Sequence, residues 1–347
     1  MRNDHVLVTG GAGFLGINLV RYLLARGARV TVLDVADFSY PERDRVEAIR
    51  GDVRDASAVR KALRDTTAVV HAAAALPLCT GEEIHEIEVE GTRVVAREAL
   101  AAGAPRMVHV SSTAVYGVPD HHPLLEDDKL EGVGPYGRAK LQAEMVCLEH
   151  RARGLIVPIL RPKSFVGPER LGVFAMLYEW ALEGRDFPVL GRGDNLYQLL
   201  DVEDLCQAID LALSGDASAV DDTFNVGAES FSTMRNDFQA VLDRAGRGGR
   251  VLGLPAAPAV TALRVLERLH LSPLYAWVYE TAARDSFVSI ERAQRKLGFR
   301  PCYSNRDALL RNFDWYVQNR AAIANATGVT HRTRWKQGAL ALIKHAF

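Results

Sequence analysis

Short apolar runs alternate along the first half of the chain with segments whose apolar residues recur at helical spacing. The apolar runs lie at residues 5–9, 29–34, 67–71 and 107–111. Runs of this length and character are typical of strands that are buried on both faces of a sheet. The segments with helical periodicity lie at residues 15–24, 56–63 and 91–100. This alternation predicts a doubly wound α/β fold, with helices on both faces of a parallel sheet and right-handed crossovers.

After Pro168 the pattern loosens and becomes mostly helical, and we expect a smaller C-terminal lobe there. A chain of 347 residues exceeds the ~250–300 residues at which single cores stop growing. The expected division is a large α/β domain at residues 1–165 to which residues 195–227 return, a substrate-binding lobe at 166–194 and 228–320, and a C-terminal tail at 321–347.

Composition and charge narrow the class of partner. Hydrophobic residues make up 48% and charged residues 24%, as in ordinary globular proteins. The formal net charge of -1 lacks the basic excess of a nucleic-acid-binding protein, so we expect no nucleic-acid partner. No acidic residue follows Asp314, and the basic tail surrounds Trp335 and the apolar segment 340–343. Two alternatives stay open for this tail: weak contact with an anionic membrane surface, or packing on the body of the protein.

The cysteines and histidines suggest neither a disulfide framework nor a metal site. No two cysteines lie at CxxC spacing, and scattered single cysteines fit a reducing cytosol. The chain enters an apolar strand directly after Met1 without a signal-peptide pattern, so we expect a cytoplasmic protein. We expect no bound metal, because His121 and His122 lack further ligands at suitable spacing.

A glycine-rich turn, residues 9–16, links the first apolar run to the first helix. Gly10, Gly13 and Gly16 lie three residues apart. Glycines at this spacing permit a tight turn and a close approach of the backbone to a pyrophosphate, which the helix N-terminus attracts. The strand before the turn and the helix after it are the context that a dinucleotide site requires. The alternative is a tight turn without a ligand.

Two aspartates are candidates for the adenosine end of a dinucleotide. Asp34 ends the second apolar run, where a carboxylate accepts hydrogen bonds from ribose hydroxyls. Its charge would repel a 2′-phosphate, and Val35 and Ala36 follow it rather than an arginine, which favours NAD over NADP. Asp52 follows a third short strand and is either a contact for the adenine amino group or a simple turn residue.

Four motifs together resemble the extended short-chain dehydrogenases/reductases, the NAD-dependent epimerase/dehydratase group. These motifs are the glycine turn, His71-Ala72-Ala73-Ala74, Ser111-Ser112-Thr113-Ala114-Val115-Tyr116-Gly117 and Tyr136-Gly137-Arg138-Ala139-Lys140. They occur in the family's order and at about its separations, within residues 5–320. The resemblance implies an NAD-binding Rossmann domain at residues 1–165. By the resemblance, NAD contacts come from Gly10, Gly13, Phe14, Leu15, Gly16, Asp34, Asp52, Val53, Ala72, Ala73, Tyr136 and Lys140.

The resemblance also implies catalytic roles for three residues. Tyr136 is the acid/base, Lys140 tunes it and binds the nicotinamide ribose, and Ser112 forms a hydrogen bond with the reacting oxygen. A free tyrosine has a pKa near ~10, too high for a base at neutral pH. Since Tyr136 and Lys140 lie at i and i+4 on one helix face, we expect the lysine and the nicotinamide charge to lower that pKa.

The chain departs from its relatives at several substrate positions. Thr113 and Ala114 stand where sugar-nucleotide 4,6-dehydratases carry an Asp-Glu pair, so that reaction is not expected. Tyr197 replaces a diphosphate-clamping arginine, and Ser164 replaces an asparagine. A later clamp is reduced to Arg284-Asp285, and Glu88 begins a helix that usually starts with asparagine. We expect substrate contacts from Thr113, Ser164, Tyr197 and Arg284.

These features leave three functions open. The family favours reversible hydride transfer at a secondary alcohol by a nucleotide-sugar epimerase. The departures, with the apolar stretch at residues 254–279, favour a 3β-hydroxysteroid-dehydrogenase-like enzyme acting on an apolar alcohol. The third alternative is a non-catalytic NAD-binding sensor, against which the intact Ser112, Tyr136 and Lys140 argue. The resemblance further implies a homodimer, with residues 91–102 and 136–151 as candidate interface helices.

Overall fold

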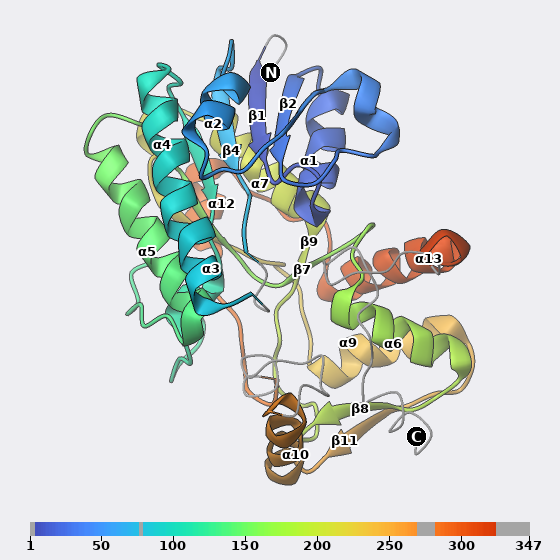
Figure 1. Ribbon diagram of the computed structural model, residues 1–347. Helices are drawn as coiled ribbons and strands as arrows, with labels where there is room; N and C mark the ends of the chain where they lie inside the picture. The colour runs from blue at the N-terminus through green and yellow to red at the C-terminus, as the bar shows by residue number, and fades with distance from the viewer. Residues whose placement is uncertain (1–3, 76–78, 269–281, 324–347) are drawn as a thin grey trace.

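A parallel seven-stranded sheet forms the centre of the molecule (Figure 1). The computed structural model describes residues 4–75, 79–268 and 282–323. Across the sheet the strand order is β10-β6-β5-β4-β1-β2-β3. The strands are β1 (His5–Thr9), β2 (Arg29–Asp34), β3 (Glu47–Arg50), β4 (Ala68–His71), β5 (Met107–Val110), β6 (Ile159–Pro162) and β10 (Thr223–Val226). The order reverses between β1 and β4, the kind of position at which doubly wound sheets bind ligands. The doubly wound fold predicted from the sequence is confirmed.

Helices cover both faces of this sheet (Figure 1). On one face α4 packs between α2 and α5, and on the other α1 packs against α7, which also contacts α12. The bounds of the elements around the sheet are α1 (Phe14–Ala25), η1 (Pro41–Arg45), α2 (Ala56–Ala62), α3 (Gly81–His85), η2 (Glu86–Glu90), α4 (Gly91–Ala101), η3 (Thr113–Tyr116), α5 (Gly134–Arg151), α7 (Val202–Ser214), α8 (Ala217–Val220) and α12 (Glu291–Leu297). The expected helices at 56–63 and 91–100 differ from these by one residue at an end.

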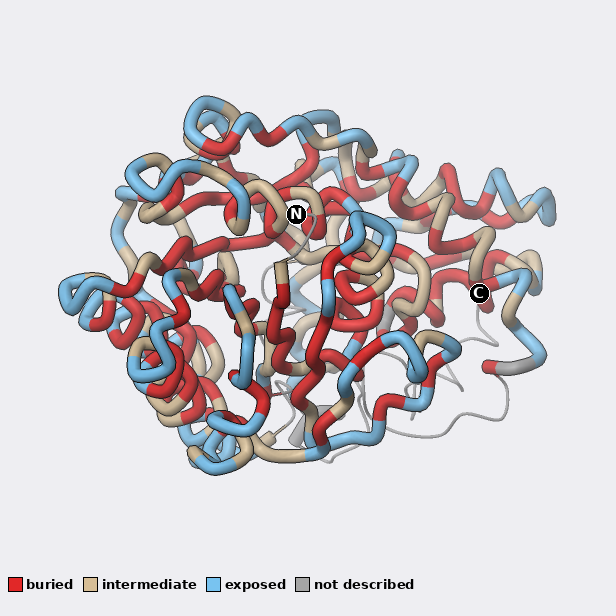
Figure 2. The backbone as a smooth tube through the Cα atoms, turned by 90° about the horizontal axis from the view of Figure 1, so that it is seen from above, coloured by how far each residue is buried: buried red, intermediate tan, exposed pale blue. Residues whose placement is uncertain are grey.

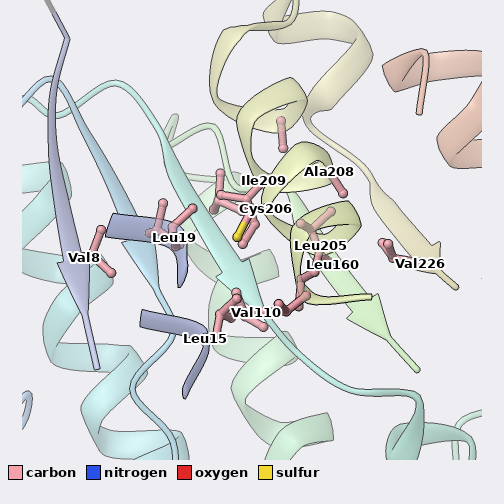
Figure 3. Close-up of a cluster of buried hydrophobic side chains, with 14 of the residues drawn as sticks. Val8, Leu15, Leu19, Val110, Leu160, Leu205, Cys206, Ala208, Ile209 and Val226 are labelled. Carbon is pink, nitrogen blue, oxygen red and sulfur yellow. The ribbon is translucent and has the colours of Figure 1, made fainter. Parts of the chain in front are cut away.

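The apolar face of α7 holds one side of the sheet to α1. Leu205 and Ile209 of α7 are fully buried, and Figure 3 shows them beside Leu160 of β6 and Leu19 of α1. Burial of a leucine or isoleucine side chain stabilises a fold by about 1.5–3 kcal/mol. Seen from above, buried residues run through the strands, while exposed residues lie on the outer turns (Figure 2).

A second apolar core lies beyond the carboxyl ends of the strands, where Figure 1 shows the lower part of the molecule. Its largest fully buried side chains are Tyr178 and Tyr316. The elements of this part are β7 (Phe165–Val166), α6 (Gly172–Glu183), β8 (Phe187–Leu190), β9 (Leu200–Asp201), α9 (Met234–Ala245), β11 (Val251–Leu254), α10 (Ala256–Arg268) and α13 (Asn305–Ile323). The parallel pair β8–β11 was not predicted, because each strand is short and carries a proline or glycine.

The domain boundaries expected from the sequence stay a prediction, and most of the basic tail, from residue 324 onward, lies outside the described residues. Among the helices of the described part, none is long and apolar enough to cross a membrane.

Candidate active site

The glycine turn lies against the end of β4 so closely that side chains would not fit. Gly10 has a φ of +69°, and a Cβ atom there would lie 2.7 Å from Cα of Ala73. A Cβ at Gly16 would lie 2.3 Å from the carbonyl oxygen of Gly10. Gly13 is exposed and begins α1 without a side-chain cap, so the first turn of the helix faces outward from the loop. This arrangement fits the pyrophosphate of a dinucleotide.

Hydrogen bonds from a buried threonine hold β4 beside the glycine turn. Thr9 Oγ1 accepts hydrogen bonds from the backbone N–H groups of Ala72 and Ala73, each at 3.2 Å. The same hydroxyl lies 2.8 Å from Nδ1 of His71, whose Nε2 lies 3.0 Å from Thr92 Oγ1. Burial lowers the pKa of His71 to about 3, so the imidazole is neutral at physiological pH. His71 therefore orients the turn from inside the core.

The two aspartates predicted for the adenosine end differ in their partners. The Asp34 carboxylate accepts hydrogen bonds from the backbone N–H groups of Ala12 and Ala36, both at 2.9 Å, which fixes it beside the glycine turn. The Asp52 carboxylate forms an ion pair with Arg54 at 2.6 Å. Hydrogen bonds from Arg54 lower the pKa of Asp52 although burial opposes them. The ribose and adenine contacts of these carboxylates stay predictions.

The three predicted catalytic residues come together at the carboxyl ends of β4 and β5. Ser112 begins η3, where its Oγ accepts the backbone N–H of Ala114 at 3.1 Å. The same side chain forms a hydrogen bond with Tyr136, which lies in the first turn of α5. One turn later, the Lys140 ammonium lies 5.8 Å from the centre of the Tyr136 ring.

A carboxylate without a predicted role completes this group. Glu88, in the π-helical turn η2, is 1% exposed, and its Oε2 lies 2.9 Å from the Lys140 ammonium. Its Oε1 accepts the backbone N–H of Ala75 at 3.0 Å, while Lys140 also donates to the carbonyl of Val110 at 3.1 Å. The departure from asparagine at residue 88 was visible in the sequence, but nothing in the sequence paired it with Lys140.

This ion pair changes the electrostatics expected of the tyrosine. Burial raises the pKa of the Tyr136 phenol, the Lys140 ammonium lowers it as expected, and the Glu88 carboxylate raises it again. The net direction from the protein's own groups is upward, although Lys140 lowers the pKa of Tyr136 as expected. The combined effect of Lys140 and the nicotinamide charge stays a prediction. For Lys140, burial lowers the pKa but Glu88 and Tyr136 raise it further, so the ammonium stays charged.

A pocket lies next to the candidate catalytic group, since Thr113, the residue after Ser112, is part of its lining. Its volume is about 430 Å³ when the open solvent at its mouth is included. Its lining residues are Thr113, Gly117, Val118, Pro119, Leu124, Lys163, Arg284, Asp285 and Ser286. The structure therefore brings together the predicted substrate residues Thr113 and Arg284.

The other two predicted substrate residues lie beside this pocket. The hydroxyl of Ser164 forms a hydrogen bond with Tyr197, and the Lys163 ammonium lies 5.4 Å from the centre of the Tyr197 ring. Ser286, which lines the pocket, was not singled out from the sequence, because no motif includes it.

A second buried ion pair, between Arg161 and Glu144, lies beside the segment that carries Ser112. The guanidinium of Arg161 donates hydrogen bonds to both carboxylate oxygens of Glu144, the shortest at 2.7 Å, and to the Tyr116 hydroxyl at 2.9 Å. Glu144 in turn accepts a hydrogen bond from the hydroxyl of Ser111. This network ties α5, β6 and the end of β5 together around Ser112.

Comparison with known proteins places this site in a family. The model of the NAD dependent epimerase/dehydratase family matches residues 6–227. Uncharacterized protein y4nG of Sinorhizobium fredii is 36% identical over 344 residues, which cover 98% of this chain and 85% of that protein. The 3 beta-hydroxysteroid dehydrogenase/Delta 5→4-isomerase of Mycobacterium tuberculosis is 27% identical over 342 residues, which cover 90% of each protein.

A solved structure agrees over nearly the whole chain. The crystal structure of DesIV, a dTDP-glucose 4,6-dehydratase of Streptomyces venezuelae with NAD and TYD bound, has a TM-score of 0.74 and 28% sequence identity. The match covers 92% of this chain and 98% of that one. The cofactor of the family is NAD, which fits the glycine turn and Asp34. The chain belongs to the NAD-dependent epimerase/dehydratase family.

Proposed function

We propose that the protein is an NAD-dependent nucleotide-sugar epimerase, which oxidises a carbinol centre and reduces the ketone from its other face. The observation that carries the hydride-transfer part is the convergence of Ser112, Tyr136 and Lys140 beside a pocket. The observation that favours a charged substrate is the presence of Lys163 and Arg284 in the pocket lining. Cations there suit the phosphates or carboxylates of a nucleotide sugar.

In this proposal the chain's residues handle the proton and the oxygen. NAD, when bound, accepts a hydride from the carbinol carbon and later returns it. Tyr136 as phenolate takes the hydroxyl proton during oxidation and returns it during reduction, so protons and electrons balance over the cycle. Ser112 donates a hydrogen bond to the reacting oxygen, and Lys140 stabilises the phenolate.

Elimination of water is not part of the proposed reaction. A 4,6-dehydration requires an acid and a base beside the ketone, and the two positions after Ser112 are Thr113 and Ala114. A threonine hydroxyl and a methyl group supply neither a carboxylic acid nor a carboxylate. We infer that this chain differs in reaction from its dehydratase relatives.

A second candidate is a dehydrogenase of an apolar alcohol. Val118, Pro119 and Leu124 give the pocket an apolar wall, and Tyr197 offers a partly buried ring where an arginine would clamp a diphosphate. The similarity to the mycobacterial 3 beta-hydroxysteroid dehydrogenase supports the same alternative. The intact catalytic group weighs against a non-catalytic NAD sensor.

A cytoplasmic homodimer remains part of the proposal. The exposed apolar residues Met145 and Leu148 lie on α5, one of the two helices expected at the interface.

Nucleotide binding separates the two candidate functions. We expect one of UDP, dTDP, GDP and CDP to raise the melting temperature of the NAD-loaded protein. A ligand at 100 times its dissociation constant stabilises a fold by about 2.7 kcal/mol, which a thermal-shift assay detects readily. No shift with any of the four would exclude the nucleotide-sugar assignment and leave the apolar alcohol as the substrate class.

Removal of the phenol should abolish turnover without abolishing cofactor binding. We expect Tyr136→Phe to lower kcat by roughly 10²–10⁴-fold, the range for loss of a general acid/base. The substrates are sugar nucleotides of the responding base, and NAD affinity is measured in parallel by calorimetry. The matched control is Tyr22→Phe in α1, whose hydroxyl contacts only Arg26 among the described residues. Turnover of Tyr136→Phe equal to that of the control would overturn the assignment.

Neutralising the partner of Lys140 should change the titration of Tyr136. Because Glu88 raises the pKa of Tyr136, we expect Glu88→Gln to move that pKa downward. The phenolate then forms at lower pH, and the acid limb of the oxidation profile moves the same way. The measurement is a pH titration of tyrosinate absorbance, from which the titration of Tyr136→Phe in the same background is subtracted.

The control for this titration is Glu90→Gln, which removes a carboxylate that is 41% exposed and paired with Arg93 at 3.3 Å. No change is expected in the control. An unchanged or raised Tyr136 pKa in Glu88→Gln would contradict the expected influence of the Glu88 carboxylate on Tyr136.

A further inference from the structure

Lys163 is a buried lysine for which the described residues supply no acidic partner. Its residue exposure is 5%, and it follows β6, where its backbone N–H donates to the carbonyl of Val226 at 2.9 Å. Among the described residues, the hydrogen-bond partner of its ammonium is the hydroxyl of Ser286, at 2.7 Å. The aromatic face of Tyr197 is the other neighbour of the charge. Lys140, the other buried lysine of the described chain, has Glu88 as its counter-ion.

The surroundings do not balance this charge. Burial lowers the pKa of Lys163 to about 7, and no neighbouring carboxylate raises it. The charged residues that share the pocket lining are Arg284 and Asp285. The Oδ1 atom of Asp285 accepts the backbone N–H of Leu196 at 2.8 Å, and this carboxylate is not among the groups that shift the pKa of Lys163. A buried ammonium without a counter-ion costs stability, so its retention at a pocket calls for a ligand that completes it.

The position of Lys163 in the pocket suggests which molecule supplies this anion. The pocket begins at Thr113, the residue after Ser112, and both Lys163 and Arg284 line it. Because Thr113 shares this lining and directly follows Ser112, we infer that a group which reaches the two cations belongs to the substrate. Two cations in one pocket suit an oxyanion, since each charge-assisted hydrogen bond is stronger than a neutral one.

We propose that Lys163 and Arg284 form an oxyanion subsite, which selects substrates that carry a carboxylate or phosphate near the reacting carbinol. The subsite rests on the proposed function, because it is part of the same substrate pocket. With this subsite the substrate is an alcohol that also carries an anion. The anion is either a carboxylate on the sugar that reacts or the phosphate of a nucleotide. A neutral sterol would leave Lys163 unpaired.

The test observes Lys163 directly in the NAD-loaded full-length protein. The chain has seven lysines, which [13Cε]lysine labelling resolves by NMR, and the signal lost in Lys163→Met assigns the residue. Acetate and inorganic pyrophosphate are titrated separately at constant ionic strength, with chloride as the balancing salt. We expect one probe to move the Lys163 signal saturably toward its protonated position, while the signal of Lys140 stays in place.

The identity of the active probe separates the two sources of the anion. A response to acetate assigns the subsite to a carboxylate, and a response to pyrophosphate alone assigns it to a phosphate. Arg284→Met should raise the apparent Kd of the active probe roughly tenfold or more, as expected for a lost charge-assisted contact. Arg192→Met is the matched control, because that side chain is 88% exposed and paired with Asp194.

A Lys163 signal that responds to neither probe, or only as it does to chloride, would overturn the subsite. It would leave Lys163 as a structural link to Ser286. The readout uses neither turnover nor a nucleotide, so its failure is distinguishable from failure of the proposed epimerase activity.

Discussion

The buried ammonium of Lys140 is the charge around which the candidate active site is organised. It is fixed by the Glu88 carboxylate and the Val110 carbonyl, and it faces the ring of Tyr136. A buried ion pair is stable only when its remaining hydrogen bonds are satisfied, and here the backbone of Ala75 satisfies the second carboxylate oxygen. The pair also connects the π-helical turn η2 to α5 across the end of the sheet. The pair therefore fixes the Lys140 ammonium one helical turn from Tyr136.

This arrangement makes the Tyr136 phenol a weaker acid. Glu88 holds Lys140 charged but offsets part of its influence on Tyr136, whose pKa burial already raises. A positively charged cofactor beside the phenol adds an influence in the opposite direction. In this account Tyr136 becomes an effective base only in the complex with oxidised NAD. Coupling of this kind would limit proton removal to the complex that can also accept a hydride.

Much of the site could be predicted because its geometry is local in sequence. The glycine turn follows from spacing alone, and Tyr136 and Lys140 meet because they are four residues apart on one helix. Glu88 could not be assigned in this way, since its contact with Lys140 depends on how η2 packs against α5. Lys163 and Ser286 are 123 residues apart in the sequence, and they meet where Ser286 pairs with Tyr197 in a β-bridge. The strands β8 and β11 were missed because they are four residues long and interrupted by Pro188 and Gly253.

The most direct test of this account is the pKa of Tyr136 in complexes with the two redox states of the cofactor. The protein has ten tyrosines, and [13Cζ]tyrosine labelling with Tyr136→Phe as the assignment variant isolates the signal. The account predicts that Tyr136 titrates at lower pH with NAD+ than with NADH, because only the oxidised nicotinamide carries a positive charge. The same titration midpoint in both complexes, or a higher one with NAD+, would contradict the role of Tyr136 as the base poised by Lys140 and the cofactor.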